Sequence, residues 1–82
     1  MKKSTCYEIF GKRIKELRLE MGLSVEEVAG IIGVKSSVYP SYEAGERIVR
    51  SDILLALARL FRVSCDYLLG LTDVKWIPFD ER

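Results

Sequence analysis

The sequence contains no histidine and only two cysteines among its 82 residues. Cys6 and Cys65 stand far apart and form no CxxC pair, so we expect no metal site. A disulfide between them is open in principle, although two reduced thiols are the ordinary state in the cytosol. The sequence also lacks a glycine-rich phosphate loop and any nucleophile–base pair. We therefore expect neither a cofactor nor an enzyme.

Long apolar runs are also missing from the chain. No stretch approaches the roughly 20 apolar residues that span a bilayer. The two lysines near the N-terminus are not followed by the apolar segment that is typical of a signal peptide. These absences predict a cytoplasmic protein with no membrane partner. No motif indicates a small-molecule ligand.

The chain also carries little net charge. Its formal value is +1, with 13 basic and 12 acidic side chains. Residues 1–50 hold nine Lys or Arg and seven Asp or Glu, whereas residues 51–82 hold four and five. A sequence-independent attraction to nucleic acid would therefore be modest and would have to come from a local basic patch.

What the sequence does contain is helical periodicity, in one domain. Apolar spacing predicts helices over 5–21, 25–32, a short segment before Ala44, a segment that begins after a Ser51 cap, and 65–69. Ser24 and Glu27 form a capping box for the second of these helices, and Gly33 ends it. Two short helices around a glycine turn describe a helix-turn-helix, whose second helix can lie in the DNA major groove.

The residue types in this stretch strengthen the prediction. They resemble the helix-turn-helix of the phage Cro/repressor family, also called the XRE family, and the similarity extends from about Phe10 to Leu71. The matching residues are Leu23-Ser24, Glu27-Val28-Ala29, Ile32-Gly33-Val34, Ser37, Tyr42-Glu43 and Gly45-Glu46-Arg47. The resemblance implies an all-α, compact five-helix bundle of the lambda-repressor-like fold over residues 1–71. Residues 72–82 form a short C-terminal tail.

The same resemblance implies a function and a set of contact residues. It implies a sequence-specific transcriptional regulator, most simply a repressor, of bacterial, phage or mobile-element origin, which binds double-stranded DNA as a homodimer. The implied base-facing residues are Lys35, Ser36, Ser37 and Ser41, and the implied phosphate contacts are Arg47, Arg50 and the backbone of Val25. Serine hydroxyls donate or accept hydrogen bonds, so they discriminate weakly between bases.

Two further residues are implied to form an ion pair. In the family an arginine at the position of Arg18 pairs with the glutamate of the "YE.G" signature, here Glu43. The pair would hold the end of the recognition helix against the first helix, and this structural role is our main interpretation. A phosphate contact from Arg18 is the secondary one.

Pro40 departs most clearly from the family pattern. A proline lacks the N–H that would bond the carbonyl of Ser36, and its ring crowds that carbonyl. The recognition helix therefore either begins late, between Ser37 and Tyr39, or begins early and is kinked. A late start leaves a shortened but working helix, whereas an altered surface would suit another kind of partner.

The segment 51–61 and the tail carry more apolar surface than one core face needs. Within the segment 51–61, the residues expected to face the core are Leu54, Leu57, Ala58 and Phe61. A second apolar group is expected to meet the tail of the same chain or of a dimer partner, and it comprises Ile53, Ala56, Leu60, Trp76 and Phe79. The near-neutral charge, Pro40 and this apolar surface also leave an alternative function open: a protein-interaction module, such as an antitoxin or a co-regulator subunit, on the same fold.

Overall fold

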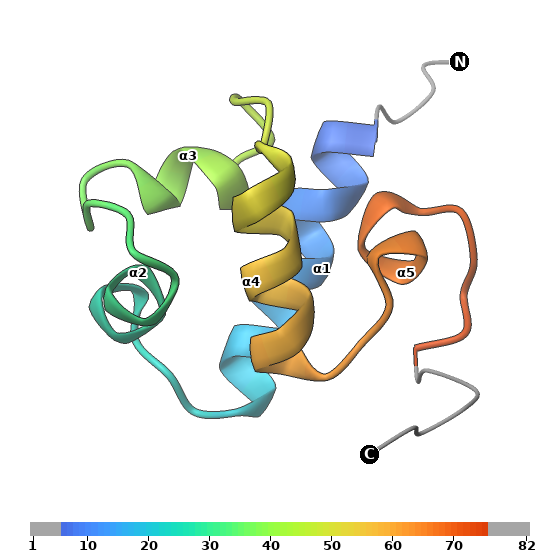
Figure 1. The fold of residues 1–82 in the computed structure, drawn as a ribbon, viewed down its shortest axis with the longest axis horizontal. Coiled ribbons are helices and arrows are strands. Elements are labelled where there is room, and N and C mark those ends of the chain that lie inside the picture. The colour runs from blue at the N-terminus through green and yellow to red at the C-terminus, as the bar shows by residue number, and fades with distance from the viewer. Residues whose placement is uncertain (1–5, 76–82) are drawn as a thin grey trace.

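The computed structural model describes residues 6–75, and its secondary structure within that range is entirely helical (Figure 1). The elements are α1 (Cys6–Glu20), α2 (Val25–Ile32), α3 (Tyr39–Glu43), α4 (Ser51–Phe61) and α5 (Cys65–Leu69). The predicted all-α five-helix architecture is thus confirmed. Thr5, the expected first residue of the helix over 5–21, and the tail residues Trp76 and Phe79 lie outside the described residues.

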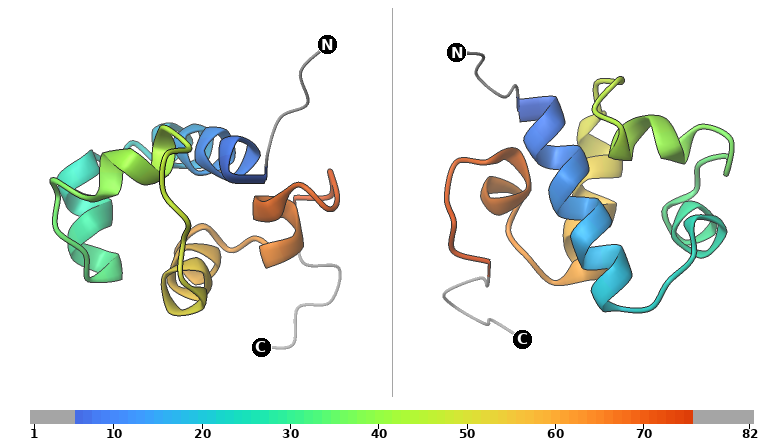
Figure 2. Two further views of the ribbon diagram at one scale, coloured as in Figure 1. Left: turned by 90° about the horizontal axis from the view of Figure 1, so that it is seen from above. Right: turned by 180° about the vertical axis from the view of Figure 1, so that it is seen from behind.

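Helix α1 is the central element of the bundle. It packs against α3, α4 and α5, and the view from behind shows it between α3 on one side and α5 on the other (Figure 2, right). Its residues Phe10, Ile14 and Leu17 are buried in the core, as their spacing predicts. Met21, which the same spacing would place on this stripe, is 50% exposed. The reason is that α1 ends at Glu20 and Met21 lies in the following turn.

The contact between α1 and α3 depends on the absence of a side chain at Gly11. A Cβ atom there would lie 2.5 Å from the carbonyl oxygen of Glu43 and 2.6 Å from that of Tyr42. Backbone therefore meets backbone at this point, and only glycine fits. The position of α3 is consequently set by the path of α1 itself.

The ends of α2 follow the sequence signals. Ser24 accepts a hydrogen bond from the Glu27 amide, and the Glu27 carboxylate accepts one from the Ser24 amide, so the predicted capping box is confirmed. Gly33 takes the left-handed conformation, with φ +81°, as a helix-ending glycine does. Val28, Ala29 and Ile32 are buried on one face of the helix.

Two predictions for α4 need correction. Ser51 is the first helical residue and not the cap, which is Arg50 in extended conformation. Ile53 was expected to belong to the second apolar group, which meets the tail. It is only 8% exposed, however, and lies in the core of its own chain. It shares one stripe with Leu57 and Phe61, four and eight residues further on, and that stripe faces inward.

The other α4 residues of the second apolar group remain partly exposed. Ala56 and Leu60 are half-buried and pack against the core, whereas Leu55 is exposed. Leu54, expected in the core, is also half-buried at its edge. The apolar surface that α4 leaves uncovered in a single chain is thus smaller than its composition suggests.

Candidate nucleic-acid interface

The segment between α2 and α3 is a turn and not the start of a helix. The amides of Val38 and Tyr39 both donate to the carbonyl of Lys35. Helix α3 then begins at Tyr39, which makes Pro40 its second residue. A first-turn amide has no partner within a helix, so proline costs little there. Of the two alternatives for Pro40, the late start is confirmed.

Three of the four residues implied to face DNA bases lie in this turn. Lys35, Ser36 and Ser37 are exposed. None of their side chains forms a hydrogen bond or ion pair with another residue in the range 6–75. We refer to Lys35–Ser37 as the reading turn. Their base contacts stay a prediction, but their side chains are accessible to a ligand.

Ser41, the fourth of these residues, is placed differently. It is half-buried on α3, and its hydroxyl donates a hydrogen bond to the carbonyl of Val38 at 2.6 Å. The same hydroxyl accepts a hydrogen bond from Nε of Arg47 at 3.0 Å. The structure thus connects Ser41 with Arg47, a residue that was assigned to a phosphate, and places Ser41 on α3, outside the reading turn.

The other two implied phosphate contacts also have neighbours in the structure. The guanidinium of Arg50 lies 2.9 Å from the carboxylate of Asp52. Both side chains are exposed, and the hydrogen bond from Arg50 holds the pKa of Asp52 below its usual range. Val25 is the half-buried first residue of α2, followed by the acidic Glu26 and Glu27. These carboxylates oppose the attraction of the helix N-terminus for a phosphate.

Arg18 and Glu43 form the predicted ion pair. Arg18 Nε lies 2.6 Å and Nη2 3.1 Å from the two carboxylate oxygens of Glu43, so the contact is bidentate. The side chains are only 12% and 10% exposed. A third hydrogen bond joins Arg18 to the carbonyl of Leu23, just before α2. Three of the five N–H donors of this guanidinium are bonded within the protein and the side chain is largely buried, which favours the structural role over a phosphate contact.

Tyr39 completes the surroundings of this pair. Its ring is fully buried and meets Tyr42 edge to face, with 6.3 Å between the ring centres. Its hydroxyl is buried beside the ion pair without a hydrogen bond to any of the described residues. Burial, together with the Glu43 carboxylate, raises the pKa of this hydroxyl. The start and the end of α3 are therefore both fixed to the core.

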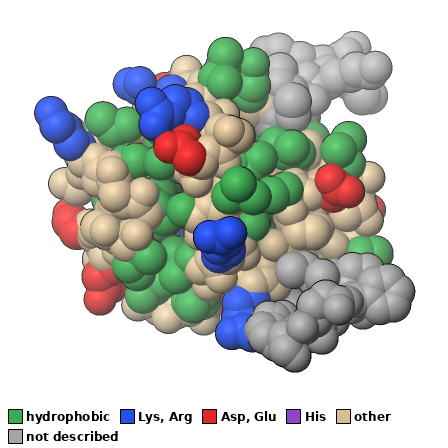
Figure 3. Space-filling model, viewed as in Figure 1, with side chains coloured by type: hydrophobic (Ala, Val, Ile, Leu, Met, Phe, Trp, Pro, Cys, Tyr) green, Lys and Arg blue, Asp and Glu red, His purple; other side chains and the backbone are tan. Residues whose placement is uncertain are grey.

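Charge on this face is mixed. In Figure 3, Lys and Arg side chains lie over the loop that follows α3 and at the edge of the α2–α3 turn, with hydrophobic side chains between them. Ile48, between Arg47 and Arg50 in the sequence, is 65% exposed. The basic residues therefore form separate points and not one continuous strip.

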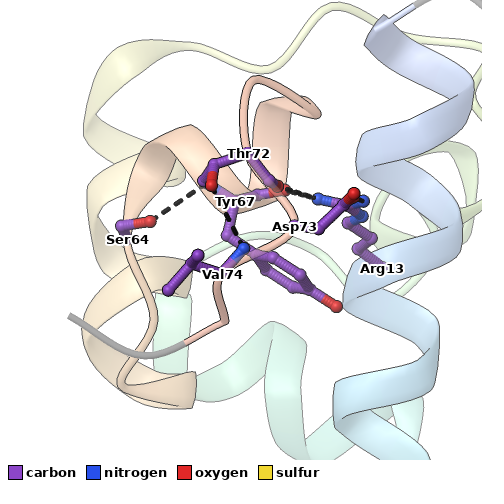
Figure 4. Close-up of polar contacts among 6 residues, drawn as sticks. All are labelled: Arg13, Ser64, Tyr67, Thr72, Asp73 and Val74. Carbon is purple, nitrogen blue, oxygen red and sulfur yellow. Dashed lines mark hydrogen bonds and ion pairs between the residues drawn. The ribbon is translucent and has the colours of Figure 1, made fainter. Parts of the chain in front are cut away.

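A second arginine of α1 was missed by sequence reasoning. The helical spacing of α1 places Arg13 away from its apolar stripe and so predicts a solvated side chain, yet the guanidinium lies 4.2 Å from the ring centre of Tyr67. It also donates hydrogen bonds to the carbonyls of Tyr67 and Thr72 and pairs with Asp73 at 2.8 Å (Figure 4). Its side chain thereby fastens the segment after α5 to α1. We refer to this set of contacts as the Arg13 clamp.

The Arg13 clamp bears on the tail prediction. The described part of the tail, residues 72–75, contacts α1 of its own chain: Thr72 and Asp73 accept hydrogen bonds from Arg13, and Lys75 forms an ion pair with Glu20 at 3.3 Å. The acceptors for Arg13 are mostly backbone carbonyls, which no residue pattern reveals. Only Asp73 offered a signal, as an acidic residue far along the chain.

Some kinds of site are absent from the described part of the chain. No group of three or more Cys, Asp or Glu side chains there could hold a metal ion. Cys65 has a free thiol. No helix within residues 6–75 is long and apolar enough to cross a membrane.

Two short helices joined by a turn, with the second pinned to α1 by an ion pair, define a helix-turn-helix domain. A family model described as helix-turn-helix matches residues 14–68. The chain therefore belongs to this family, and the resemblance to its Cro/repressor (XRE) type is confirmed.

Individual relatives agree with this assignment. The chain is 43% identical over 65 residues to the uncharacterized HTH-type transcriptional regulator YobD of Bacillus subtilis, a match that covers 79% of this chain and 58% of YobD. It is 39% identical over 64 residues to the HTH-type transcriptional regulator ImmR of the same organism, covering 78% and 50%. The chain thus spans only about half the length of these curated relatives.

Solved structures give the same result. The restriction-modification controller protein C.AhdI from Aeromonas hydrophila is 34% identical, with a TM-score of 0.69, and the match covers 76% of this chain and 94% of that one. The clp gene regulator ClgR from Corynebacterium glutamicum has a TM-score of 0.77 over 84% of this chain and 73% of its own. Its identity is 20%, so it supports the fold alone.

Proposed function

We propose that this chain binds double-stranded DNA and regulates transcription, with the reading turn and α3 in the major groove. The proposal rests on one observation: the reading turn is accessible, and the helix that follows it is held rigidly. Lys35, Ser36 and Ser37 are exposed, while α3 directly behind them is fixed by the Arg18–Glu43 pair. A rigid support reduces the entropy lost when a surface is ordered on binding. Arg47 lies in the loop at the other end of α3, where it can contact a phosphate.

Several finer features belong to the same proposal. The chain acts as a repressor, in the cytoplasm, without catalysis and without a cofactor. It binds as a homodimer, because two copies can read two half-sites about one helical turn apart. The exposed Leu55 and half-buried Ala56 and Leu60 of α4 are available for the dimer contact. The names of the relatives, which are transcriptional regulators, support the proposal.

A second candidate function is favoured by one observation. Ile48 exposes a large apolar side chain between Arg47 and Arg50, and Arg50 is already paired with Asp52. An apolar residue at this place suits a protein partner better than a phosphate backbone. The alternative is therefore a protein-interaction module, such as an antitoxin or co-regulator subunit, with weak direct DNA binding.

The two functions separate in a binding experiment with fragmented genomic DNA at about 50 and 200 mM salt, a range over which phosphate contacts lose strength. We expect a regulator to recover a few discrete, palindromic sites at both salt concentrations. Recovery of nothing, or only of unspecific DNA that is lost at 200 mM, contradicts the regulator and favours the interaction module.

The phosphate role of Arg47 has its own test on a recovered site. Arg47→Ala should weaken binding to cognate and altered sites equally and lower the slope of log affinity against log salt by about one. Arg59→Ala is the matched control, because Arg59 is also exposed but lies in the last turn of α4. An unchanged slope in Arg47→Ala removes Arg47 from the phosphate contacts.

A further inference from the structure

We propose that Ser41 is a positioning residue for Arg47 and not a reader of bases. The inference rests on the proposed DNA-binding function and goes beyond it, because it reassigns a residue that the family pattern places against a base. It is carried by the two hydrogen bonds of the Ser41 hydroxyl.

The donor capacity of this hydroxyl is already used. A serine hydroxyl has one O–H donor and two acceptor lone pairs. The O–H is committed to the carbonyl of Val38 at 2.6 Å, and one lone pair accepts from Arg47 Nε at 3.0 Å. To donate to a base, Ser41 would have to release Val38, and its one remaining lone pair could do no more than accept from a base amino group. Ser41 is half-buried and lies beside the loop that carries Arg47. A hydrogen bond donated to a base would only replace the one donated to Val38, so it would bring no net gain.

The same residue also fixes the loop that carries Arg47. The backbone carbonyl of Ser41 accepts a hydrogen bond from the Glu46 amide at 3.0 Å. The loop after α3 is therefore tied to Ser41 by its backbone and by the side chain of Arg47. One point on α3 thus determines both where the loop runs and in which direction the guanidinium lies.

This arrangement leaves the binding groups of Arg47 available. A guanidinium has five N–H donors, of which Nε supplies one and the two terminal nitrogens supply the other four. Ser41 occupies only the Nε donor. The terminal nitrogens keep the planar fork that binds two phosphate oxygens at once. A long side chain that is held in place before binding loses less conformational freedom in the complex.

The decisive experiment compares Ser41→Ala with Ser37→Ala on the recovered site and on a set of single-base-pair variants. Loss of one hydrogen bond that orients a charged group corresponds to roughly a fivefold loss of affinity. We expect Ser41→Ala to show this loss equally on all sites, and Ser37→Ala to change the ranking of the sites. A changed ranking in Ser41→Ala overturns the proposal.

The link to Arg47 is tested by combining variants. Because Ser41 acts through Arg47, Ser41→Ala should cause no further loss in an Arg47→Ala background, and Ser41→Thr, which keeps the hydroxyl, should retain affinity. Losses that multiply in the double variant overturn the proposal.

A measurement without DNA separates this inference from the proposed function. In the free protein, NMR relaxation of the Arg47 Nε–Hε group should indicate an ordered side chain that becomes mobile in Ser41→Ala. A wild-type Arg47 side chain that is already mobile overturns the proposal. If the wild type binds no DNA, the proposed function fails, and the NMR result alone then decides whether Ser41 orders Arg47.

Discussion

Arg13 and Arg18 lie five residues apart on α1, and each fastens a different part of the chain to that helix. Arg18 holds α3 through a bidentate pair with one buried carboxylate, that of Glu43. Arg13 holds the segment after α5 through two backbone carbonyls, the face of Tyr67 and the carboxylate of Asp73, which is 97% exposed. One arginine thus depends on a single side chain, whereas the other depends mainly on the backbone.

The difference determines how each attachment can fail. A contact with one carboxylate is lost when either partner changes, and the remaining charge stays buried. A contact with backbone carbonyls does not depend on the side chains of the residues that carry them, so a substitution at Thr72 or Asp73 that leaves the backbone in place keeps it. We therefore expect substitutions of Arg18 and of Glu43 to reduce the stability by similar amounts. Substitution of Arg13 should instead reduce it more than substitution of Asp73.

The largest expected effect comes from the Arg18 side. Arg18→Met should lower the free energy of unfolding by about 3 kcal/mol, because it leaves the Glu43 carboxylate without a partner at a site where the side chain is 10% exposed. Glu43→Gln should have a similar cost. Urea denaturation followed by circular dichroism measures both.

The double variant Arg18→Met/Glu43→Leu is the control for this symmetry. It removes both charges, so it should recover a substantial part of the lost stability. A double variant that is as unstable as the sum of the single ones would show that packing, and not the buried charge, causes the loss.

A smaller effect is expected where α1 and α3 meet. Gly11→Ala should destabilise the fold by about 2 kcal/mol, because the new Cβ would lie 2.5 Å from a backbone oxygen that has no side-chain freedom to move. Gly30 occupies an exposed position of α2, and a Cβ there would have no neighbouring atom within 4 Å. Gly30→Ala should therefore stabilise the fold by about 1 kcal/mol. Thermal unfolding of the two variants decides the sign, and equal effects would contradict the close contact.

The smallest effects belong to the Arg13 clamp. Arg13→Met should cost about 1–2 kcal/mol through the loss of hydrogen bonds and of the contact with the Tyr67 ring. Asp73→Asn should cost less than about 0.5 kcal/mol, because exposed ion pairs contribute little. Denaturant midpoints and hydrogen exchange at residues 71–75 measure the two losses. Equal costs for the two variants would mean that the clamp resembles the Arg18 pair after all.

The same contrast explains how far the sequence predicts this molecule. The capping box of Ser24 and Glu27 was predictable from residue types at the required spacing, and the Arg18–Glu43 pair from the family resemblance, because both of its partners are present in this chain. Arg13 was misjudged because its main acceptors are backbone carbonyls, which every residue has. Ile53 was misjudged because it lies at the border of two faces, where helical spacing alone cannot decide which face is covered.

The candidate interface was predictable to a similar extent. The sequence indicated the exposed turn of Lys35–Ser37 and restricted the start of α3 to two alternatives. It did not indicate that Ser41 contacts Arg47, because that contact depends on the path of the loop after Gly45.

Pro40 has a consequence for the thermodynamics of any complex that this face forms. Helix α3 cannot lengthen by a turn toward Ser36, because residue 40 has no amide hydrogen for that carbonyl. A helical extension of the preceding segment would cost about 3 kcal/mol at Pro40, which disfavours coupling between binding and helix formation there. The heat-capacity change of association should then reflect only the surface that the two partners bury, without the added contribution of a disorder-to-helix transition.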